Sequence, residues 1–136
     1  MAIRVGDRAA RKFVIDGATM RWFQEVAEDT SKIHCDRAYA QSRGYADVIA
    51  YGGILVAHLS HLLGMKIPGT SGTSIAWSIK FHEPLYVGEQ AEIVLEVAYV
   101  SAATGVVEAK FKIMAGQKQV ASGTTQSIVP LDEIGA

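Results

Sequence analysis

The sequence predicts an α+β fold in which an antiparallel sheet wraps around one central, buried helix. Three observations support this fold class. A single strand candidate comes early, an apolar segment without any acid follows at residues 53–63, and the hydrophobic pattern then changes to a period of two over four long segments. One strand, one buried helix and then successive long strands are typical of helices packed against one face of an antiparallel sheet.

The composition indicates one globular domain. The 136 residues suffice for a single sizeable core and are too few for two, so we expect one domain over residues 1–136. Hydrophobic residues make up 49% and charged residues 20% of the chain, which argues against disorder. The net charge is −1 and the lysines and arginines are scattered, so the chain lacks a basic stripe and nucleic-acid binding is not expected.

The cysteine content and the N-terminal residues favour a soluble protein of the cytoplasm. Cys35 is the single cysteine and cannot form a disulfide within the chain, which fits a reducing compartment. The first eight residues have no apolar signal core, and the longest apolar stretch is interrupted by His58, Ser60 and His61. That stretch is too short to cross a bilayer, so no membrane span is expected.

The first third of the chain predicts one strand and two short helices. Residues 8–15 predict the strand, which an Asp-Gly turn ends. Thr19 is the expected cap of a helix of about two turns. Residues 29–34 then predict a loop, and Asp36 is the expected N-cap of a second short helix over residues 37–42.

The remainder predicts the buried helix and the sheet around it. Residues 53–63 are apolar nearly all round, so a helix here is buried on most sides, and Gly64 is the expected residue just past its end. Four long strands are expected, with glycine-containing turns between them, over residues 74–81, 91–101, 106–115 and 118–128. Strands of this length curve to enclose the helix, an arrangement called the hotdog fold. A single sheet leaves its edges exposed, so a homodimer or higher homo-oligomer is expected.

The candidate chemistry starts from Asp29 and His34, which are five residues apart after the first predicted helix. A carboxylate and an imidazole that point into one cleft can share a water molecule. The carboxylate then takes a proton from the water and the imidazole supplies one to the substrate. An arbitrary pair at this spacing more often has no such role, with the aspartate ending a helix and the histidine lying in an ordinary loop. The spacing by itself leaves both interpretations open.

The segment Tyr51-Gly52-Gly53 opens the apolar helix. A helix N-terminus has N–H donors without partners and the positive end of the dipole, which suit a carbonyl oxygen that gains negative charge. Glycine at this point lets a ligand approach the backbone closely. A plain tight turn with small residues for packing explains the same sequence equally well.

Four other polar residues give weaker indications. Ser60 lies in the apolar helix, where most serines only bond the carbonyl four residues back. His58 and His61 can share a helix face, but they have no third ligand nearby in the sequence, so no metal site is expected. Cys35 follows His34 directly, and adjacent side chains in a loop usually point apart, so a thiol nucleophile is not expected.

Three segments, taken in order, resemble the motifs of one known family. Residues 29–36 keep both acids and the histidine of the motif Asp-x-Asn-Pro-x-His-x-Asp. Residues 49–64 follow the pattern Ile-x-His-Gly-Met and then a helix of the type Leu-x-x-x-x-x-Ser-x-Leu-Leu-Gly. Residues 81–89 match Phe-x-x-Pro-Val-x-x-Gly-Asp. The chain thus resembles the MaoC-like hydratases, in particular the (R)-specific enoyl-CoA hydratases, over nearly its entire length.

The resemblance implies a reaction and three catalytic groups. The reaction is syn hydration of a trans-2-enoyl-CoA to an (R)-3-hydroxyacyl-CoA, or the reverse dehydration. By this resemblance Asp29 and His34 bind the catalytic water and exchange protons with it and with the α-carbon, while the N–H of Gly52 polarises the thioester carbonyl. No cofactor is expected, because the coenzyme A thioester is the substrate. In such dimers the second subunit builds part of the acyl tunnel.

The resemblance also implies a substrate-binding set, and two departures from the family pattern are important. Ser60 matches a family serine that helps to order the active site, and Ser31, Tyr51 and Gly53 complete the expected set. Ser31 replaces the motif asparagine and offers fewer hydrogen bonds than an amide, and Tyr51 replaces the histidine before the helix glycine. Lys32 in place of proline loosens the loop further. Substrate preference is where these departures matter most.

Four other functions fit the same fold. Acyl-CoA thioesterases and acyl-carrier-protein dehydratases commonly take a catalytic acid from the central helix, and residues 51–64 contain none. A MaoC-type 3-hydroxyacyl-carrier-protein dehydratase subunit stays open, because the sequence does not separate coenzyme A from a carrier protein. A non-catalytic acyl-CoA sensor usually has an attached DNA-binding module, for which a chain of 136 residues has no room.

Overall fold

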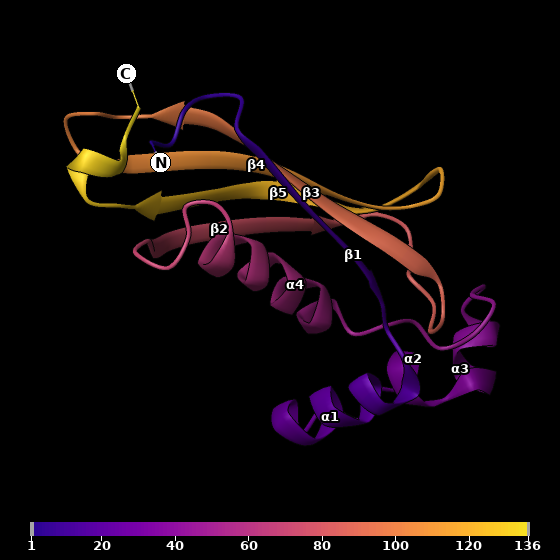
Figure 1. Ribbon diagram of the computed structural model, residues 1–136. Helices are drawn as coiled ribbons and strands as arrows, with labels where there is room; N and C mark the ends of the chain where they lie inside the picture. The colour runs from indigo at the N-terminus through magenta and orange to yellow at the C-terminus, as the bar shows by residue number, and fades with distance from the viewer. Residues whose placement is uncertain (1, 136) are drawn as a thin grey trace.

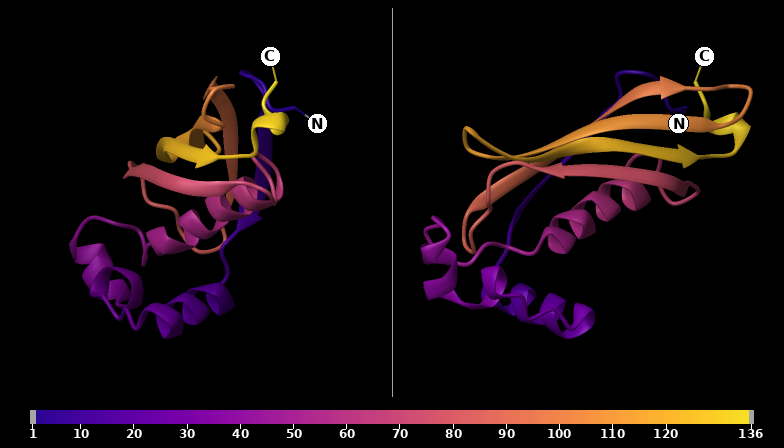
Figure 2. Two further views of the ribbon diagram at one scale, coloured as in Figure 1. Left: turned by 90° about the vertical axis from the view of Figure 1, so that its left-hand side faces the viewer. Right: turned by 180° about the vertical axis from the view of Figure 1, so that it is seen from behind.

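A curved five-stranded sheet lies over one long helix, and a group of short helices lies beyond that helix (Figure 1). The computed structural model describes residues 2–135. The elements in chain order are β1 Arg8–Val14, α1 Gly17–Ala27, α2 Lys32–Cys35, α3 Arg37–Ser42, α4 Gly52–Met65, β2 Thr73–Phe81, β3 Gln90–Val100, β4 Val106–Ala115, β5 Lys118–Ile128 and a 3-10 turn at Leu131–Glu133. Figure 2 shows from two further sides that α1, α2 and α3 stand apart from the sheet.

The sheet has the strand order β1-β3-β4-β5-β2, and every neighbouring pair is antiparallel. The α+β fold class and the four long strands are confirmed. The predicted bounds of β4 and β5 agree with the structure, and those of β2 and β3 lie within one residue of it. Their period-two pattern determines this outcome, because successive side chains of a strand point to opposite faces. The strands β1 and β2 form the two edges.

The core lies between α4 and the inner face of the sheet. Helix α4 buries one set of apolar side chains, namely Ile54, Leu55, Leu59, Leu62 and Leu63. They meet alternate residues of the central strands, namely Ala91, Ile93 and Leu95 of β3 and Ala109, Phe111 and Ile113 of β4. The central buried helix that the sequence predicts is therefore confirmed, and its N-terminal end is held at a fixed place against the sheet.

Helix α1 begins earlier than expected. Asp16 rather than Thr19 is its N-cap, because the Asp16 carboxylate accepts a hydrogen bond of 2.8 Å from the N–H of Thr19. The helix has 11 residues, more than the two turns predicted. An aspartate three residues before a free N–H competes better for the cap than a threonine already inside the first turn.

The predicted loop at residues 29–34 is partly helical. Its last residues belong to the single turn α2, which contains His34. Asp36 caps α3 as predicted, and its carboxylate accepts a hydrogen bond of 3.0 Å from the N–H of Tyr39. Two short helices therefore replace one loop and one helix in the segment between α1 and α4.

The end of α4 also differs from the prediction. Gly64 lies inside the helix, which runs from Gly52 to Met65, and Lys66 is the C-cap with its N–H bonded to the Leu62 carbonyl. A glycine is tolerated in a helix when packing of the apolar face outweighs its lower propensity. Within residues 2–135, no helix combines the length and the apolar composition that crossing a membrane requires.

Candidate active site

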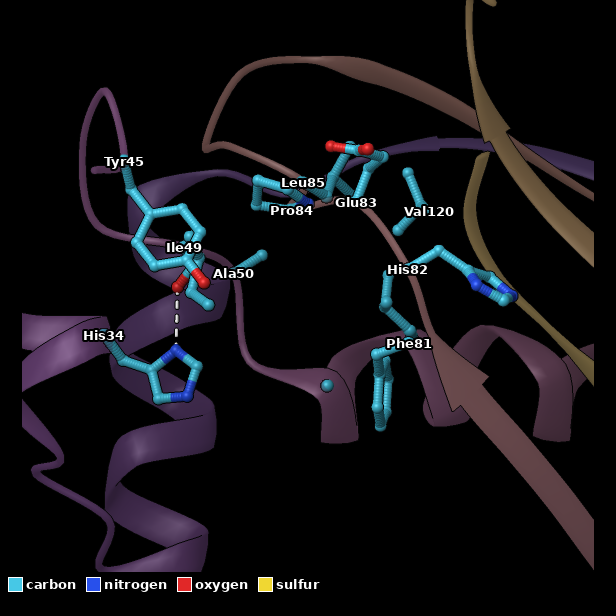
Figure 3. Close-up of a pocket in the computed structure, with 12 residues that line it drawn as sticks. His34, Tyr45, Ile49, Ala50, Phe81, His82, Glu83, Pro84, Leu85 and Val120 are labelled. Atoms are coloured by element: carbon cyan, nitrogen blue, oxygen red, sulfur yellow. Dashed lines mark hydrogen bonds between the residues drawn. The ribbon is translucent and has the colours of Figure 1, made fainter. Parts of the chain in front are cut away.

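A cavity of about 410 Å³ opens where α4 begins, between that helix and the connection from β2 to β3 (Figure 3). Its lining combines apolar and polar side chains, namely His34, Tyr45, Ile49, Ala50, Gly52, Leu55, Phe81, His82, Glu83, Pro84, Leu85 and Val120. The N–H of Ala50 donates a hydrogen bond of 2.8 Å to the Leu85 carbonyl, which joins the two walls. The cavity therefore brings together His34 and Gly52, two of the three predicted catalytic residues.

His34 is held in one orientation by Ile49. Its ring nitrogen Nδ1 lies 2.8 Å from the Ile49 carbonyl oxygen, a contact drawn in Figure 3. Because a carbonyl oxygen can only accept, Nδ1 has the proton and donates it. The N–H of Ile49 in turn donates to the Ile33 carbonyl at 3.1 Å, so both the N–H and the carbonyl of Ile49 are bonded to residues of α2. The second nitrogen of His34, Nε2, is left for proton exchange.

Asp29 follows α1 and is held by Ser31. Its Oδ1 accepts one hydrogen bond of 2.9 Å from the N–H of Ser31 and a second from the Ser31 hydroxyl. The Ser31 hydroxyl, then the Ser31 N–H and more weakly the charge of His34 hold the pKa of Asp29 below its usual value. Asp29 is thus an ionised carboxylate at neutral pH. Its side chain lies outside the lining of the cavity.

Gly52 is the first residue of α4, so its N–H has no partner within the helix. The first turn has no acidic residue to neutralise the positive end of the dipole. A Cβ at Gly52 would lie 2.7 Å from Cζ of Phe81, so any side chain here would have to displace that ring. Gly52 therefore presents bare backbone to the cavity.

Gly53 serves packing. A Cβ at this position would lie 2.2 Å from Cζ of Phe23, so the glycine lets α1 approach α4. Gly53 and Ser31, both predicted to bind substrate, lie outside the lining of the cavity. The hydroxyl and N–H of Ser31 are both bonded to Asp29.

Tyr51 and Ser60 lie away from the cavity as well. Tyr51 is 2% exposed, and its hydroxyl donates a hydrogen bond of 2.6 Å to the backbone carbonyl of Asp29. Ser60 is exposed and borders a separate hollow of about 90 Å³ next to Trp77 and Ser127. Eight residues of helix separate it from Gly52, about 12 Å at 1.5 Å per residue. The protomer therefore does not bring Ser60 to Asp29 and His34.

The sequence did not single out three polar residues that line the cavity, namely Tyr45, His82 and Glu83. His82 is directed toward β5 (Figure 3), and its Nε2 lies 2.8 Å from the Ser122 hydroxyl. Glu83 donates its N–H to the Gln119 carbonyl. Both residues lie between Phe81 and Pro84, inside the segment 81–89 that resembles a family motif. Two polar side chains just past the end of a predicted strand are the signal by which the sequence could have indicated them.

His58 and His61 lie on another face of α4. Arg11 Nε donates a hydrogen bond of 3.2 Å to Nδ1 of His58, and the His58 ring stacks on Phe13 at 3.9 Å. Burial, followed by the charge of Arg11, lowers the pKa of His58. Within residues 2–135, no three His, Cys, Asp or Glu side chains are grouped closely enough to hold a metal ion.

Comparison with known proteins places this chain in a family. The sequence profile described as thioesterase superfamily matches residues 12–118, most of the chain. The chain belongs to the thioesterase superfamily. Within this superfamily it is 28% identical over 96 residues to the (R)-specific enoyl-CoA hydratase of Aeromonas caviae, which covers 71% of this chain and 72% of that protein.

Two further comparisons agree. The 3-hydroxybutyryl-CoA dehydratase of Methylorubrum extorquens is 27% identical over 96 residues, 71% of this chain, and the chain spans only 61% of that protein's length. The solved structure of the (R)-hydratase from A. caviae involved in PHA biosynthesis superposes with a TM-score of 0.88 at 24% identity, covering 94% of this chain and 98% of that one. The predicted resemblance to the MaoC-like hydratases and the hotdog fold are confirmed.

Proposed function

We propose that this protein is an (R)-specific enoyl-CoA hydratase, which adds water reversibly to a trans-2-enoyl-CoA to give an (R)-3-hydroxyacyl-CoA. The observation that supports it most is the joint placement of His34 and Gly52 at one cavity, with a free imidazole nitrogen and the first N–H of a buried helix. The stereochemistry and the thioester are proposed from the names of the relatives, which are hydratases and a dehydratase acting on CoA thioesters.

In the hydration direction the thioester oxygen accepts a hydrogen bond from Gly52 N–H, near the positive end of α4. Asp29 takes a proton from water while the water oxygen forms the bond to the β-carbon. His34 in its protonated form gives its Nε2 proton to the α-carbon. A proton then passes from Asp29 to His34, which restores the starting state. Dehydration follows the same steps in reverse, and neither direction requires a cofactor.

The cavity suits an acyl thioester. Leu55, Leu85 and Val120 provide an apolar wall for the acyl chain, while the polar atoms are concentrated at His34 and Gly52. On this proposal the protein acts as a homodimer or higher homo-oligomer. Strand β2 supports this, because it is a sheet edge with three exposed apolar side chains, Ile75, Trp77 and Phe81.

Thioester hydrolysis is the second candidate, and Glu83 is the observation that favours it. The superfamily is named for thioesterases, and Glu83 provides a carboxylate at the lining of the cavity. A hydrolase needs such a group to direct water at the thioester carbon instead of the β-carbon.

A 3-hydroxyacyl-carrier-protein dehydratase uses the same chemistry as the hydratase and differs in the carrier of the thioester.

One assay separates these functions. Crotonyl-CoA is mixed with the protein, and loss of the conjugated enoyl-thioester absorbance is followed alongside release of free thiol. Wild type is expected to lose the absorbance without thiol release, while Asp29→Asn and His34→Ala each lower kcat by roughly 100- to 10,000-fold. Matched controls are Asp16→Asn, which keeps a capping side chain on α1, and His61→Ala on the far face of α4. Both are expected to retain wild-type rates.

Either catalytic variant at full activity would sink the hydratase assignment. Thiol release that Glu83→Gln abolishes would instead establish a thioesterase. Longer, branched and carrier-protein-bound enoyl thioesters, run in parallel, define the preferred substrate.

A further inference from the structure

We infer that Tyr51 is a positioning residue that ties Asp29 and His34 into one unit and thereby sets the rate of the chemical step. This inference rests on the proposed hydratase function and assigns Tyr51 a role other than binding substrate. Tyr51 is 2% exposed and does not line the cavity, so it acts through its two neighbours.

The Tyr51 ring fixes the plane of the His34 imidazole. The two rings stack with centroids 4.2 Å apart and an angle of 28° between their planes. Phe23 packs against Tyr51 at 4.8 Å between centroids, so the tyrosine cannot slide away. The bond from Nδ1 to the Ile49 carbonyl fixes the rotation of the imidazole within that plane. Together these contacts leave Nε2 a single direction.

The Tyr51 hydroxyl fixes the backbone of Asp29. It donates a hydrogen bond of 2.6 Å to the Asp29 carbonyl oxygen, across 22 positions of sequence. Glu28, the residue before Asp29, is in the left-handed region with φ 51° and ψ 40°, which is unfavourable for a residue with a side chain. A turn that is unfavourable in isolation needs an external contact to hold it, and the Tyr51 hydroxyl is such a contact.

A short hydrogen-bond chain supports the hydroxyl. Gln24 Nε2 donates to Cys35 Sγ at 3.3 Å, and Cys35 Sγ lies 3.5 Å from the Tyr51 oxygen. Since the Tyr51 proton goes to the Asp29 carbonyl, the thiol donates to the Tyr51 oxygen. Burial, with Cys35 next and the charge of Asp29, raises the pKa of Tyr51. The hydroxyl therefore stays protonated and acts as a permanent donor.

Two of the positions that depart from the family motif, Ser31 and Tyr51, both contact Asp29. Ser31 binds its carboxylate, and Tyr51 binds its carbonyl. A histidine at position 51 is shorter, so it does not extend a donor to the place that the Tyr51 hydroxyl occupies. Holding a catalytic group in place matters, because a displacement of about 1 Å can cost about 100-fold in rate.

The test compares Tyr51→Phe, which removes only the hydroxyl, with Tyr51→Leu, which removes the ring as well. Tyr51→Phe is expected to lower kcat for crotonyl-CoA by about 10- to 100-fold with KM changed less than about 2-fold, because substrate does not touch this residue. Tyr39→Phe is the matched control on the exposed side of α3 and is expected to keep wild-type kcat and KM.

A spectroscopic arm follows His34 directly. The ring proton of His34 on the carbon between its nitrogens, assigned by its loss in His34→Ala, is recorded by NMR. The ring-current shift from the stacked tyrosine is expected in wild type and in Tyr51→Phe and is absent in Tyr51→Leu. Because Tyr51→Phe keeps the packed ring, it remains informative if Tyr51→Leu fails to fold.

The outcomes separate the two proposals. If Tyr51→Phe has the kcat of wild type, or changes only KM, the positioning role is overturned. Hydration of crotonyl-CoA by the wild-type protein still supports the proposed function in that case. Absence of hydration by wild type overturns the proposed function. In that case the His34 resonance decides the inference, and an identical shift in wild type and Tyr51→Leu overturns it.

Discussion

Ser31 shows how one residue determines the protonation state of the Asp29 carboxyl. Its side chain and N–H both donate to Oδ1 of Asp29, and they are the leading causes of the lowered pKa of that carboxyl. The sequence placed Ser31 among the substrate contacts. An aspartate carboxylate often accepts a hydrogen bond from the backbone N–H two residues later, which forms a local turn. The two-residue spacing of Asp29 and Ser31 therefore could have indicated this bond.

Removing that hydroxyl is expected to move the acid limb of the pH profile. In Ser31→Ala the pKa of Asp29 rises toward its ordinary value, because the ionised form loses its largest stabilising contact. The fall of kcat/KM at low pH, which reports the free carboxyl, therefore begins at a higher pH than in wild type. Ser42→Ala is the control, since its hydroxyl bonds the Tyr39 carbonyl elsewhere. An unmoved acid limb contradicts the assignment.

The short connection after α1 is the element that aims Asp29. The helix ends at Ala27, and Glu28 takes the left-handed conformation that glycine adopts at helix ends without penalty. Neither the positive φ nor the one-turn helix α2 could be predicted from the sequence, because a glutamate gives no local reason to leave the helical region. Contacts with residues 49–51 impose this path.

Glu28→Gly is expected to stabilise the protein by about 1 kcal/mol, because it removes the steric cost of a side chain at positive φ. Urea denaturation measures the free energy of unfolding. Glu25→Gly is the matched control, since Glu25 lies inside α1 and the same replacement there is expected to destabilise by about 1 kcal/mol. Equal destabilisation by the two variants contradicts the left-handed cap.

At the scale of the whole molecule, the edge strand β2 is the surface at which we propose that two chains assemble. Three large apolar side chains of β2 are exposed, namely Ile75 at 53%, Trp77 at 40% and Phe81 at 54%. The strand pairs with β5 on one side only, so its other hydrogen-bonding edge is free. Such an edge is a template for a second chain. Phe81 also lies against Gly52, so a partner on β2 reaches the border of the cavity.

Trp77→Lys is expected to convert the assembly to monomers, because a charge at the centre of β2 opposes pairing along this edge. Light scattering coupled to size exclusion measures the mass, which for a wild-type dimer is twice the 14.6 kDa of one chain. Val14→Lys places the same charge on the opposite edge strand β1 and is expected to leave the mass unchanged. A monomeric wild type contradicts the proposed homodimer.

Local patterns in the sequence determined the elements. The alternation in β3 and β4, the apolar face of α4 and the Asp36 cap each depend on residues a few positions apart, so they are visible without a structure. Asp29, His34 and Gly52 were predicted as catalytic residues in the same way, by their spacing and by the resemblance that their motifs support.

Tertiary structure alone decided what those residues touch. The cavity joins α2, α4 and the connection after β2, and Tyr51 reaches Asp29 across 22 positions. A pattern read along the chain does not encode which distant groups meet, because this depends on how the sheet and helices pack. In the folded chain Tyr51, Gly53 and Ser60 lie away from the cavity, whereas Glu83 lines it.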